Sequence, residues 1–293
     1  MSDWLETGRG TVFRWEVDHN DHLTVSYYFA RAADAGLTLL AALGLGPAYM
    51  ERGGRGCVTV DCYVRYRREL RVGDLLHVES GVIGVEDDAL VLGHKLFDSA
   101  SGELCTTFEQ RARHVTLADR AVVPLTAEQR RAAEARHVAW DGPARERRPR
   151  PRGLDGFRDT ARDTVKPCEM DLLGQSALSH YIQRFSACNG QAIAVFGLTP
   201  DYMRGERRGF STFEFQLEVL APLRPGDLVR VRSALLHVGG SSMRLLHVMT
   251  REPGGERVAA LEQLGVHLDM DARRPTPLPA AIREKAQAVL VQS

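Results

Sequence analysis

Two short polar segments of the chain each open with an aspartate and lie just ahead of a long apolar stretch. The first reads Asp18-His19-Asn20-Asp21-His22, and the second begins at Asp171. A carboxylate ahead of a helix can be structural, as a cap worth about 1 kcal/mol. It can also act as a general base or nucleophile, because free N–H groups at a helix start stabilise a developing oxyanion. Asp18 lies several residues before the expected helix, too far for a simple cap, and this favours chemistry.

The two segments belong to two copies of one unit, related by a constant offset of 153 residues. The stretch at 44–50 (GLGPAYM) reappears at 197–203 (GLTPDYM). The same offset relates further identical residues without a gap: Asp18 and Asp171, Tyr28 and Tyr181, Arg31 and Arg184, His94 and His247, and Gln110 and Gln263. A register held from Asp18 to the last expected helix indicates the duplication of one domain.

Each copy follows one order of elements. In the first copy, residues 10–17 read as a short strand and residues 25–43 as a helix whose polar residues share one narrow face, so the helix must be buried on most sides. Four strands follow, separated by turn signals that suit antiparallel hairpins, at residues 57–66, 75–86, 89–98 and 103–117. A five-stranded antiparallel sheet wrapped around one long central helix is an α+β hotdog, so the chain is predicted to be a tandem double hotdog.

A further short helix is expected to close each copy. Thr126 and Gln129 form a capping-box pattern at the start of the first, and Pro279 opens the second. We therefore expect hotdog domains at residues 1–140 and 158–293. The Arg/Pro-rich stretch at 141–157 is expected to be a linker, either a solvated spacer or an arm that contacts the phosphate of an anionic cofactor.

The composition limits the classes of function. The 293 residues are 44% hydrophobic and 26% charged, which is typical of a folded globular protein. Because 38 basic residues balance 38 acidic ones, no overall field attracts nucleic acid or an anionic membrane. Five cysteines without a CxxC pair and scattered histidines argue against a disulfide framework and a metal site. The N-terminus lacks a signal pattern and no apolar stretch approaches the ~20 residues that span a bilayer, so a cytoplasmic location is expected.

The first segment resembles the pattern of a known family. Asp18-x-Asn20-x-His22, ahead of Tyr28, a helix and LGLGPAYM, resembles the Asp-x-Asn-Gly-His-Met-Asn pattern of the 4-hydroxybenzoyl-CoA thioesterase-like hotdog superfamily, and within it the betainyl-CoA thioesterase branch. Segments 71–74 and 224–227 are similar to the family's strand-entering turn, and Glu262-Gln263 with His267 to its last strand. The resemblance covers both copies. It implies an acyl-CoA thioesterase with no cofactor other than the coenzyme A carried by the substrate.

The resemblance also implies catalytic residues. In that family the aspartate opening the turn activates water or attacks the thioester, a role that falls on Asp18 and on Asp171, with Asn20 and His22 orienting the water or Asp18. Around Asp171 the second copy has leucines and a glutamine where the family has more polar partners, and an apolar surround raises a carboxyl pKa. We therefore favour Asp18 as the principal catalytic residue and keep Asp171 as a candidate.

Substrate-binding residues follow from the same comparison. The thioester oxygen would lie toward backbone amides at the helix start, so the expected binding residues of the first copy are Thr24, Val25, Ser26 and Tyr28. The expected binding residues of the second copy are Gly174, Gln175 and Tyr181, with the amides of residues 177–179. Each tyrosine would pack in the helix interface or line an acyl pocket.

Two other functions remain open, because a hotdog fold does not fix function. A hydratase or dehydratase of acyl thioesters would use an Asp-x-Asn-Pro-x-His element, which Asp18-x-Asn20-Asp21-His22 approaches without the proline. A non-catalytic acyl-CoA-binding module is the third. The expected partners are an acyl-CoA substrate and neither nucleic acid nor membrane. The family's habit of pairing hotdogs implies that the two halves pair within the chain, and a homo-oligomer is left open.

Overall fold

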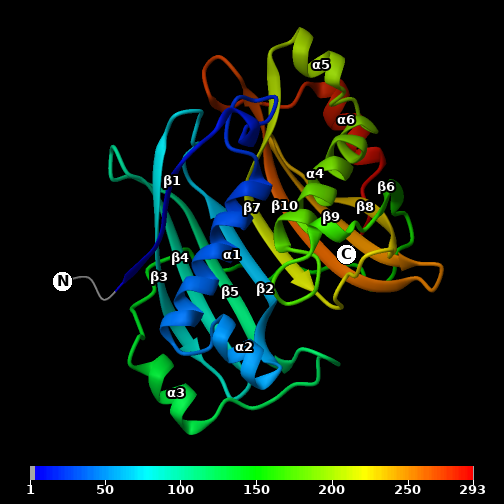
Figure 1. The fold of residues 1–293 in the computed structure, drawn as a ribbon. Coiled ribbons are helices and arrows are strands. Elements are labelled where there is room, and N and C mark those ends of the chain that lie inside the picture. Colours follow the sequence, from blue (N-terminus) through cyan, green and yellow to red (C-terminus); the bar gives the residue numbers. More distant parts are fainter. Residues whose placement is uncertain (1–3, 293) are drawn as a thin grey trace. The chain divides into compact units, whose positions relative to one another are not determined.

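The computed structural model describes residues 4–292, and their contacts divide the chain into two compact units (Figure 1). Unit 1 takes the chain up to Ala144 together with Cys168–Ser179. Unit 2 takes Arg145–Pro167 together with the chain from His180 onward. The units therefore differ from the repeats in one respect, since the turn that opens the second repeat's helix packs with the first repeat.

Unit 1 is built on an antiparallel sheet in the order β1-β3-β4-β5-β2. Its strands are β1 (Leu5–Thr11), β2 (Arg55–Tyr66), β3 (Leu75–Val85), β4 (Ala89–Asp98) and β5 (Leu104–Thr116). The turns leading into β3 and β5 contain Gly73 and Gly102, with φ angles of 89° and 74°. Residues that carry a side chain rarely adopt this left-handed backbone conformation, so glycine is the residue that lets these turns close.

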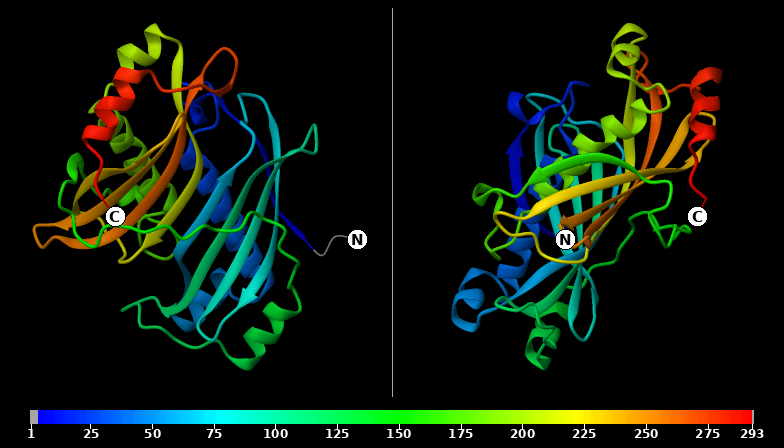
Figure 2. Two further views of the ribbon diagram at one scale, coloured as in Figure 1. Left: turned by 180° about the vertical axis from the view of Figure 1, so that it is seen from behind. Right: turned by 90° about the vertical axis from the view of Figure 1, so that its right-hand side faces the viewer.

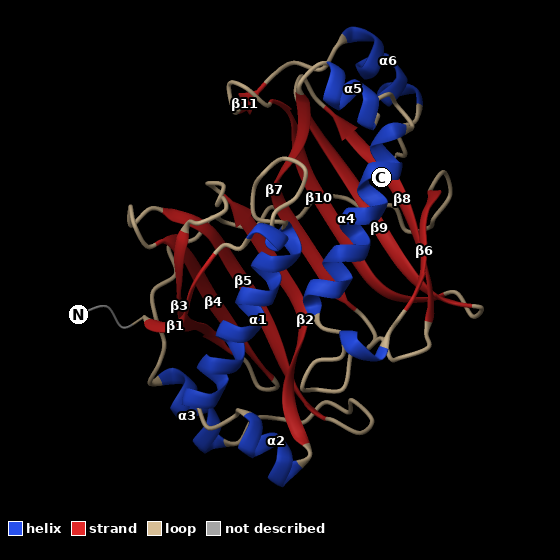
Figure 3. Cartoon of the chain, turned by 45° about the horizontal axis from the view of Figure 1, so that its top comes forward, coloured by secondary structure: helices blue, strands red, loops and turns tan. Residues whose placement is uncertain are grey.

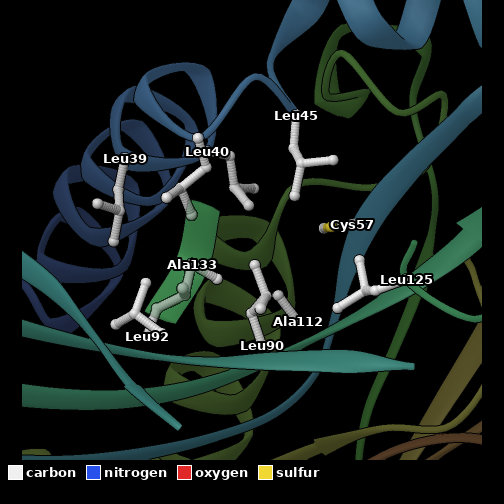
Figure 4. Close-up of a cluster of buried hydrophobic side chains, with 11 residues drawn as sticks. Leu39, Leu40, Leu45, Cys57, Leu90, Leu92, Ala112, Leu125 and Ala133 are labelled. Atoms are coloured by element: carbon white, nitrogen blue, oxygen red, sulfur yellow. The ribbon is translucent and has the colours of Figure 1, made fainter. Parts of the chain in front are cut away.

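The helix α1 (Val25–Ala42) lies along one face of this sheet (Figures 1 and 3). Its buried residues recur at helical spacing, so that one broad apolar stripe faces the strands: Tyr28, Phe29, Ala32, Ala35, Gly36, Leu39 and Leu40. Gly36 allows a close approach to the sheet, because a Cβ there would already lie 3.4 Å from Oε1 of Gln110. At the far end, Leu39 and Leu40 join Leu90 and Leu92 of β4 in a buried cluster (Figure 4).

Unit 2 repeats this plan with the sheet order β7-β10-β9-β8-β6, to which β11 adds beside β10. Its strands are β6 (Arg158–Thr164), β7 (Arg208–Val219), β8 (Leu228–Val238), β9 (Ser242–Glu252), β10 (Glu256–Asp269) and β11 (Arg274–Pro275). The helix α4 (Leu178–Ala194) provides the apolar stripe, and Ile193 packs with Phe196, Met243 and Leu245 in the core. The predicted tandem double hotdog, α+β with five main strands around a helix in each half, is confirmed.

Within residues 4–292, short α-helices besides α1 and α4 are α2 (Pro47–Gly53), α3 (Ala127–Glu134), α5 (Pro200–Gly205) and α6 (Ala280–Ala288). The two closing helices, α3 and α6, are those the sequence predicts. α3 begins with the expected capping box, in which the Gln129 amide donates to Oγ1 of Thr126. α2 and α5 were not predicted, although the repeated proline at the first position of each favours a helix start.

One predicted strand is wrong. Residues 10–17 were expected to be extended, but the strand β1 ends at Thr11 and a short 3-10 helix, η1 (Arg14–Glu16), follows. Two hydrogen bonds close this turn, since the Glu16 amide donates to the Phe13 carbonyl at 3.0 Å and the Phe13 amide donates to the Glu16 carboxylate at 2.9 Å. A carboxylate that folds back onto the chain offers the backbone an alternative to strand pairing.

A row of buried polar side chains crosses each sheet at corresponding positions. Oγ of Ser80 lies 2.7 Å from Nδ1 of His94, and Nε2 of His94 lies 3.1 Å from Oε1 of Gln110. His247 makes the same two contacts in unit 2, at 2.6 and 3.2 Å. Burial lowers the pKa of His94 and of His247 to about 4. Both are buried sheet histidines whose two ring nitrogens have hydrogen-bonding partners.

From Arg145 onward, the Arg/Pro-rich segment belongs to unit 2 and is bound to its strands. Arg148 donates to Glu214 at 2.6 Å and to Glu262 at 3.0 Å, and Arg150 donates to Glu262 at 2.9 Å. Glu214 and Glu262 lie on β7 and β10 and are each 1% exposed, so they need these countercharges. Figure 2 shows the segment, in green, running across the strands of unit 2 in the view from behind. The expectation of a solvated spacer is wrong for this reason.

Candidate active site

The residues just before the polar turn at Asp18 are fixed to α1 through Glu16. Glu16, 4% exposed, uses one carboxylate oxygen to accept the Phe13 amide and the other to pair with Arg31 of α1 at 2.8 Å. Sequence reasoning missed this pair. The repeat contained its signal, because Glu16 and Arg31 recur at the 153-residue offset as Glu169 and Arg184.

Backbone hydrogen bonds close the turn and bring its ends together. The Asp18 amide donates to the His22 carbonyl at 3.0 Å, a bridge joins Val17 to Leu23, and the Thr24 amide donates to the Glu16 carbonyl at 2.8 Å. Asp18 therefore lies across from His22, directly before the start of α1. The sequence predicted that these residues act together, and the fold places them together.

The Asp18 carboxylate has two neighbours from its own turn. Its Oδ1 accepts the Asn20 amide at 2.8 Å and lies 3.5 Å from Nδ1 of His22. The Asp18 side chain is 25% exposed and the His22 side chain 14% exposed, whereas Asn20 is buried. A partly shielded carboxylate beside an imidazole can accept a proton from water or attack an electrophile, so this pair has the geometry of a general base.

The start of α1 retains free donors. Thr24 is the N-cap residue, yet its side chain makes no capping hydrogen bond, whereas Thr126 and Thr199 cap α3 and α5 in the ordinary way. Among residues 4–292, the amides of Val25 and Ser26 have no hydrogen-bond acceptor. Thr24 was expected to offer its amide to the thioester oxygen, but this amide already donates to the Glu16 carbonyl. The donors available to an oxyanion are therefore those of Val25 and Ser26.

The second turn closes in the same way. The Asp171 amide donates to the Gln175 carbonyl at 2.8 Å, a bridge joins Met170 to Ser176, and the Ala177 amide donates to the Glu169 carbonyl at 2.8 Å. The Ala177 amide is thus occupied like that of Thr24. Gly174 has φ of 69°, and its counterpart Asp21 has φ of 60°, so both turns need one left-handed residue at the same place.

The second carboxylate is held differently. Oδ1 of Asp171 accepts two amides, from Leu173 at 2.8 Å and from Gln175 at 3.2 Å. Burial raises the pKa of Asp171, although those amides and the nearby guanidinium of Arg120 oppose the rise. Arg120 also donates to the Leu173 carbonyl at 2.7 Å, a contact that sequence reasoning missed. Gln175 is buried at the position where the first turn has His22.

Both predicted binding tyrosines are buried and engaged in packing or backbone contacts. Tyr28 packs edge-on against Tyr66 with ring centroids 5.3 Å apart, and burial raises its pKa. The Tyr181 hydroxyl accepts the Leu223 amide at 3.0 Å and donates to the Ala221 carbonyl at 3.3 Å. These contacts favour the packing role over the pocket-lining one.

Within the described residues, no group of three or more His, Cys, Asp or Glu side chains is arranged to hold a metal ion. No single helix between residues 4 and 292 is long and apolar enough to cross a membrane; α1 and α2 meet that test only when joined, with a 69° bend between them.

Comparison with known families finds one that matches both repeats. The pattern of the thioesterase-like superfamily matches residues 12–133 and again residues 165–286. The two matches are 153 residues apart at both ends, which is the offset seen in the sequence.

Curated relatives match a single repeat. A betainyl-CoA thioesterase of Pseudomonas aeruginosa is 30% identical over 120 residues, which are 40% of this chain and 74% of that protein. An L-carnitine dehydrogenase/betainyl-CoA thioesterase of Rhizobium meliloti is 30% identical over 112 residues, which are 38% of this chain but 22% of that longer protein.

Solved structures match across both repeats. A 12:0-ACP thioesterase from Umbellularia californica has a TM-score of 0.70 at 14% identity, covering 94% of this chain and 95% of that one. An acyl-ACP thioesterase from Bacteroides thetaiotaomicron has a TM-score of 0.68 at 14% identity, covering 88% and 96%. At these identities the likeness shows the fold alone.

Proposed function

The chain belongs to the thioesterase-like superfamily, and on that premise we propose that it hydrolyses acyl-CoA thioesters at the turn that opens with Asp18. Membership confirms the resemblance drawn from the sequence and, with the relatives' names, the class of enzyme, a thioester hydrolase. The choice of coenzyme A as the thiol carrier is supported by the curated relatives, which are named betainyl-CoA thioesterases.

The reaction follows from the groups around the turn. The thioester carbonyl oxygen is placed toward the amides of Val25 and Ser26, which donate to it as it becomes negative. As a general base, Asp18 takes a proton from water while the water oxygen bonds to the carbonyl carbon; the carbon–sulfur bond then breaks, and the sulfur leaves as the thiol with the proton that Asp18 held. As a nucleophile, the Asp18 carboxylate bonds to the carbonyl carbon and the carbon–sulfur bond breaks, which leaves a mixed anhydride and a thiolate. Water then hydrolyses the anhydride, which frees Asp18 and the acid, and the proton released from that water goes to the thiolate. His22 and Asn20 hold Asp18 in position.

Rough magnitudes support an enzyme of this design. A positioned general base contributes about 10² to 10⁴ in rate, and one oxyanion donor about 10² to 10³. The observation that carries the proposal is the uncapped start of α1 next to a partly exposed Asp18. A threonine that leaves its helix uncapped forgoes about 1 kcal/mol of stability, which is expected where the amides serve a substrate.

The decisive experiment compares two single-atom changes. Purified wild-type protein, Asp18→Asn and Asp171→Asn are incubated with short, branched, aromatic and long acyl-CoAs, and free thiol and enoyl absorbance are followed. We expect wild-type thiol release, a loss of 10²-fold or more in Asp18→Asn, and a change below about tenfold in Asp171→Asn.

Other outcomes would redirect the assignment. Loss of activity in Asp171→Asn alone would transfer the catalytic role to the second turn. Water addition without thiol release would indicate a hydratase, and acyl-CoA binding without turnover would indicate a binding module. Circular dichroism of each variant controls for folding.

A further inference from the structure

Two aromatic rings stack on the surface beside the candidate active turn. Phe13 and Trp15 have ring centroids 4.5 Å apart and planes only 6° from parallel. Trp15 is 71% exposed and Phe13 is 43% exposed. They lie in the dark blue segment between β1 and α1 in Figure 1. We call Phe13, Arg14 and Trp15 the aromatic platform.

An exposed pair of this kind is informative because large aromatic side chains usually contribute to the core. Burial of such a ring removes 150–250 Å² from water, at roughly 25 cal/mol per Å². The platform forgoes most of this gain, although it is held rigidly by the hydrogen bonds between Phe13 and Glu16. A preorganised apolar surface that stays in water indicates a ligand.

Comparison of the two repeats distinguishes the aromatic platform from exposed apolar residues that both copies have. Leu75 is 52% exposed, and so is its counterpart Leu228, so exposure there belongs to the fold of either copy. The platform has no such counterpart, because Lys166 and Cys168 stand where Phe13 and Trp15 would recur. The aromatic rings therefore occur only in the repeat that also has the Asp-x-Asn-x-His residues.

The platform is joined to the reacting groups. Trp15 is three residues from Asp18, so their Cα atoms are at most about 11 Å apart. The next residue, Glu16, holds the Thr24 amide at the start of α1. A group stacked on Trp15 is thus within the length of the thiol carrier of a substrate whose carbonyl lies at Val25.

Arg14, which lies between Phe13 and Trp15 in the sequence, favours an anionic ligand. Arg14 has a side chain 77% exposed and pairs with Asp21, itself 62% exposed, at 2.9 Å. An exposed pair of this kind contributes about 0–1 kcal/mol and is readily exchanged for another anion. Guanidinium groups bind phosphate through two parallel hydrogen bonds, and bases stack on aromatic faces for about 1–3 kcal/mol each.

We propose that the aromatic platform binds the nucleotide part of coenzyme A, with the adenine stacked on Trp15 and a phosphate at Arg14. This inference rests on the proposed function and extends it, because it makes the chain selective for thioesters carried by coenzyme A over those carried by a protein.

The test compares substrates with and without the nucleotide. Trp15→Ala is expected to raise the KM for an acyl-CoA by about 5- to 150-fold, the loss of one stacked base, with little change in kcat. The KM for the same acyl group on N-acetylcysteamine, which has no nucleotide, is expected to change less than twofold. Trp15→Phe should recover much of the affinity, and Leu75→Ala, an exposed apolar control, should alter neither KM.

A binding measurement keeps the test independent of catalysis. Adenosine 3′,5′-bisphosphate should quench the tryptophan fluorescence of the wild type, and this quenching should be lost in Trp15→Phe and weakened in Arg14→Gln. If neither substrate is hydrolysed but quenching follows this pattern, the proposed function fails while the platform stands.

Two results would overturn the platform. One is an equal KM change for both substrates in Trp15→Ala, or no change for either. The other is a wild-type dimer that dissociates in Trp15→Ala while the KM for acyl-CoA stays constant, since that would assign the rings to a second copy of the chain.

Discussion

The turns at Asp18 and Asp171 have the same backbone conformation, but the surroundings of their carboxylates differ. Each is closed by three corresponding contacts, and each occupies the amide of its helix N-cap residue with a glutamate carbonyl. Asp18 keeps one carboxylate oxygen near an imidazole and is partly exposed. Asp171 is bound by two amides, and burial raises its pKa.

The two turns keep the same backbone hydrogen bonds although their side chains differ. The backbone hydrogen bonds depend little on side chains, so leucine and glutamine are tolerated where Asn20 and His22 stand in the first turn. The Asp18 carboxylate accepts the backbone amide of Asn20 just as Asp171 accepts that of Leu173, so the side chain that distinguishes the first turn at its carboxylate is His22. We therefore infer that the first turn carries the reaction and that Asp171 mainly holds the second turn together.

The largest expected effect comes from giving the first turn the second turn's residues. Asn20→Leu combined with His22→Gln should lower thiol release by about 10²-fold. The double change removes the imidazole beside the Asp18 carboxylate, and a base misplaced by an ångström loses roughly that factor, whereas leucine keeps the backbone amide that binds Asp18. Stopped-time assays with Ellman's reagent measure the rate. His19→Gln, an exposed change in the same turn, is the control. An unchanged rate in the double variant would show that Asp18 needs neither neighbour.

The second prediction concerns a feature that both repeats have, the buried sheet histidine. The pKa of His94 and His247 is about 4 in the folded protein against 6.5 for an ordinary histidine, so the unfolded chain binds more protons between these values. Stability is full above pH 6.5 and falls as the pH drops toward 4, by roughly 3 kcal/mol for each histidine. Urea unfolding between pH 7 and 4 measures this loss. His94→Gln and His247→Gln should each flatten the profile by a similar amount.

The third prediction concerns a position where the second turn is less stable than the first. Leu23 is buried in the first turn, whereas its counterpart Ser176 is fully buried with an Oγ that has no hydrogen-bond partner within residues 4–292. Ser176→Ala should raise the free energy of unfolding by about 1–2 kcal/mol, because an unpaired buried hydroxyl is removed. Thermal unfolding measures the change. A lower melting temperature would mean that a partner, such as a bound water, satisfies the hydroxyl.

The smallest expected effect concerns the left-handed residue of each turn. Asp21 has φ of 60°, a conformation that costs most L-residues about 1–2 kcal/mol and aspartate less. Asp21→Gly should therefore stabilise the protein by less than about 1 kcal/mol, and Gly174→Asp should destabilise it by a similar amount. Paired chemical unfolding curves resolve the two signs. If both changes destabilise, the Arg14–Asp21 pair contributes more than an exposed ion pair usually does.

Much of the fold was predictable because its signals are local. The predicted helix at 25–43 corresponds to α1 at Val25–Ala42, and the predicted strand at 89–98 is β4. Apolar periodicity and turn residues specify such elements within a few residues of sequence. Residues 10–17 are the exception, since their alternating pattern suits a strand but the Glu16 side chain folds back onto the Phe13 amide.

The candidate site was predicted in part. The closeness of Asp18 to Asn20 and His22 follows from a short turn, and the structure has it. Which amides at the start of α1 have an acceptor could not be predicted. The acceptor of the Thr24 amide, for example, depends on how residues 16–24 fold together. The contact of Arg120 with Leu173 joins residues 53 positions apart, and no local pattern indicates it.

By itself the sequence determined that one hotdog unit occurs twice, where its central helices begin, and which aspartates open the turns ahead of them. Only the tertiary structure decided that the amides of Val25 and Ser26 find no acceptor among residues 4–292, that burial raises the pKa of Asp171, and that Arg148 and Arg150 together pair with Glu214 and Glu262. The reason is physical. Secondary structure is specified by residues that are neighbours in the chain, whereas solvent exposure and hydrogen-bond partners depend on residues that folding brings together from distant positions.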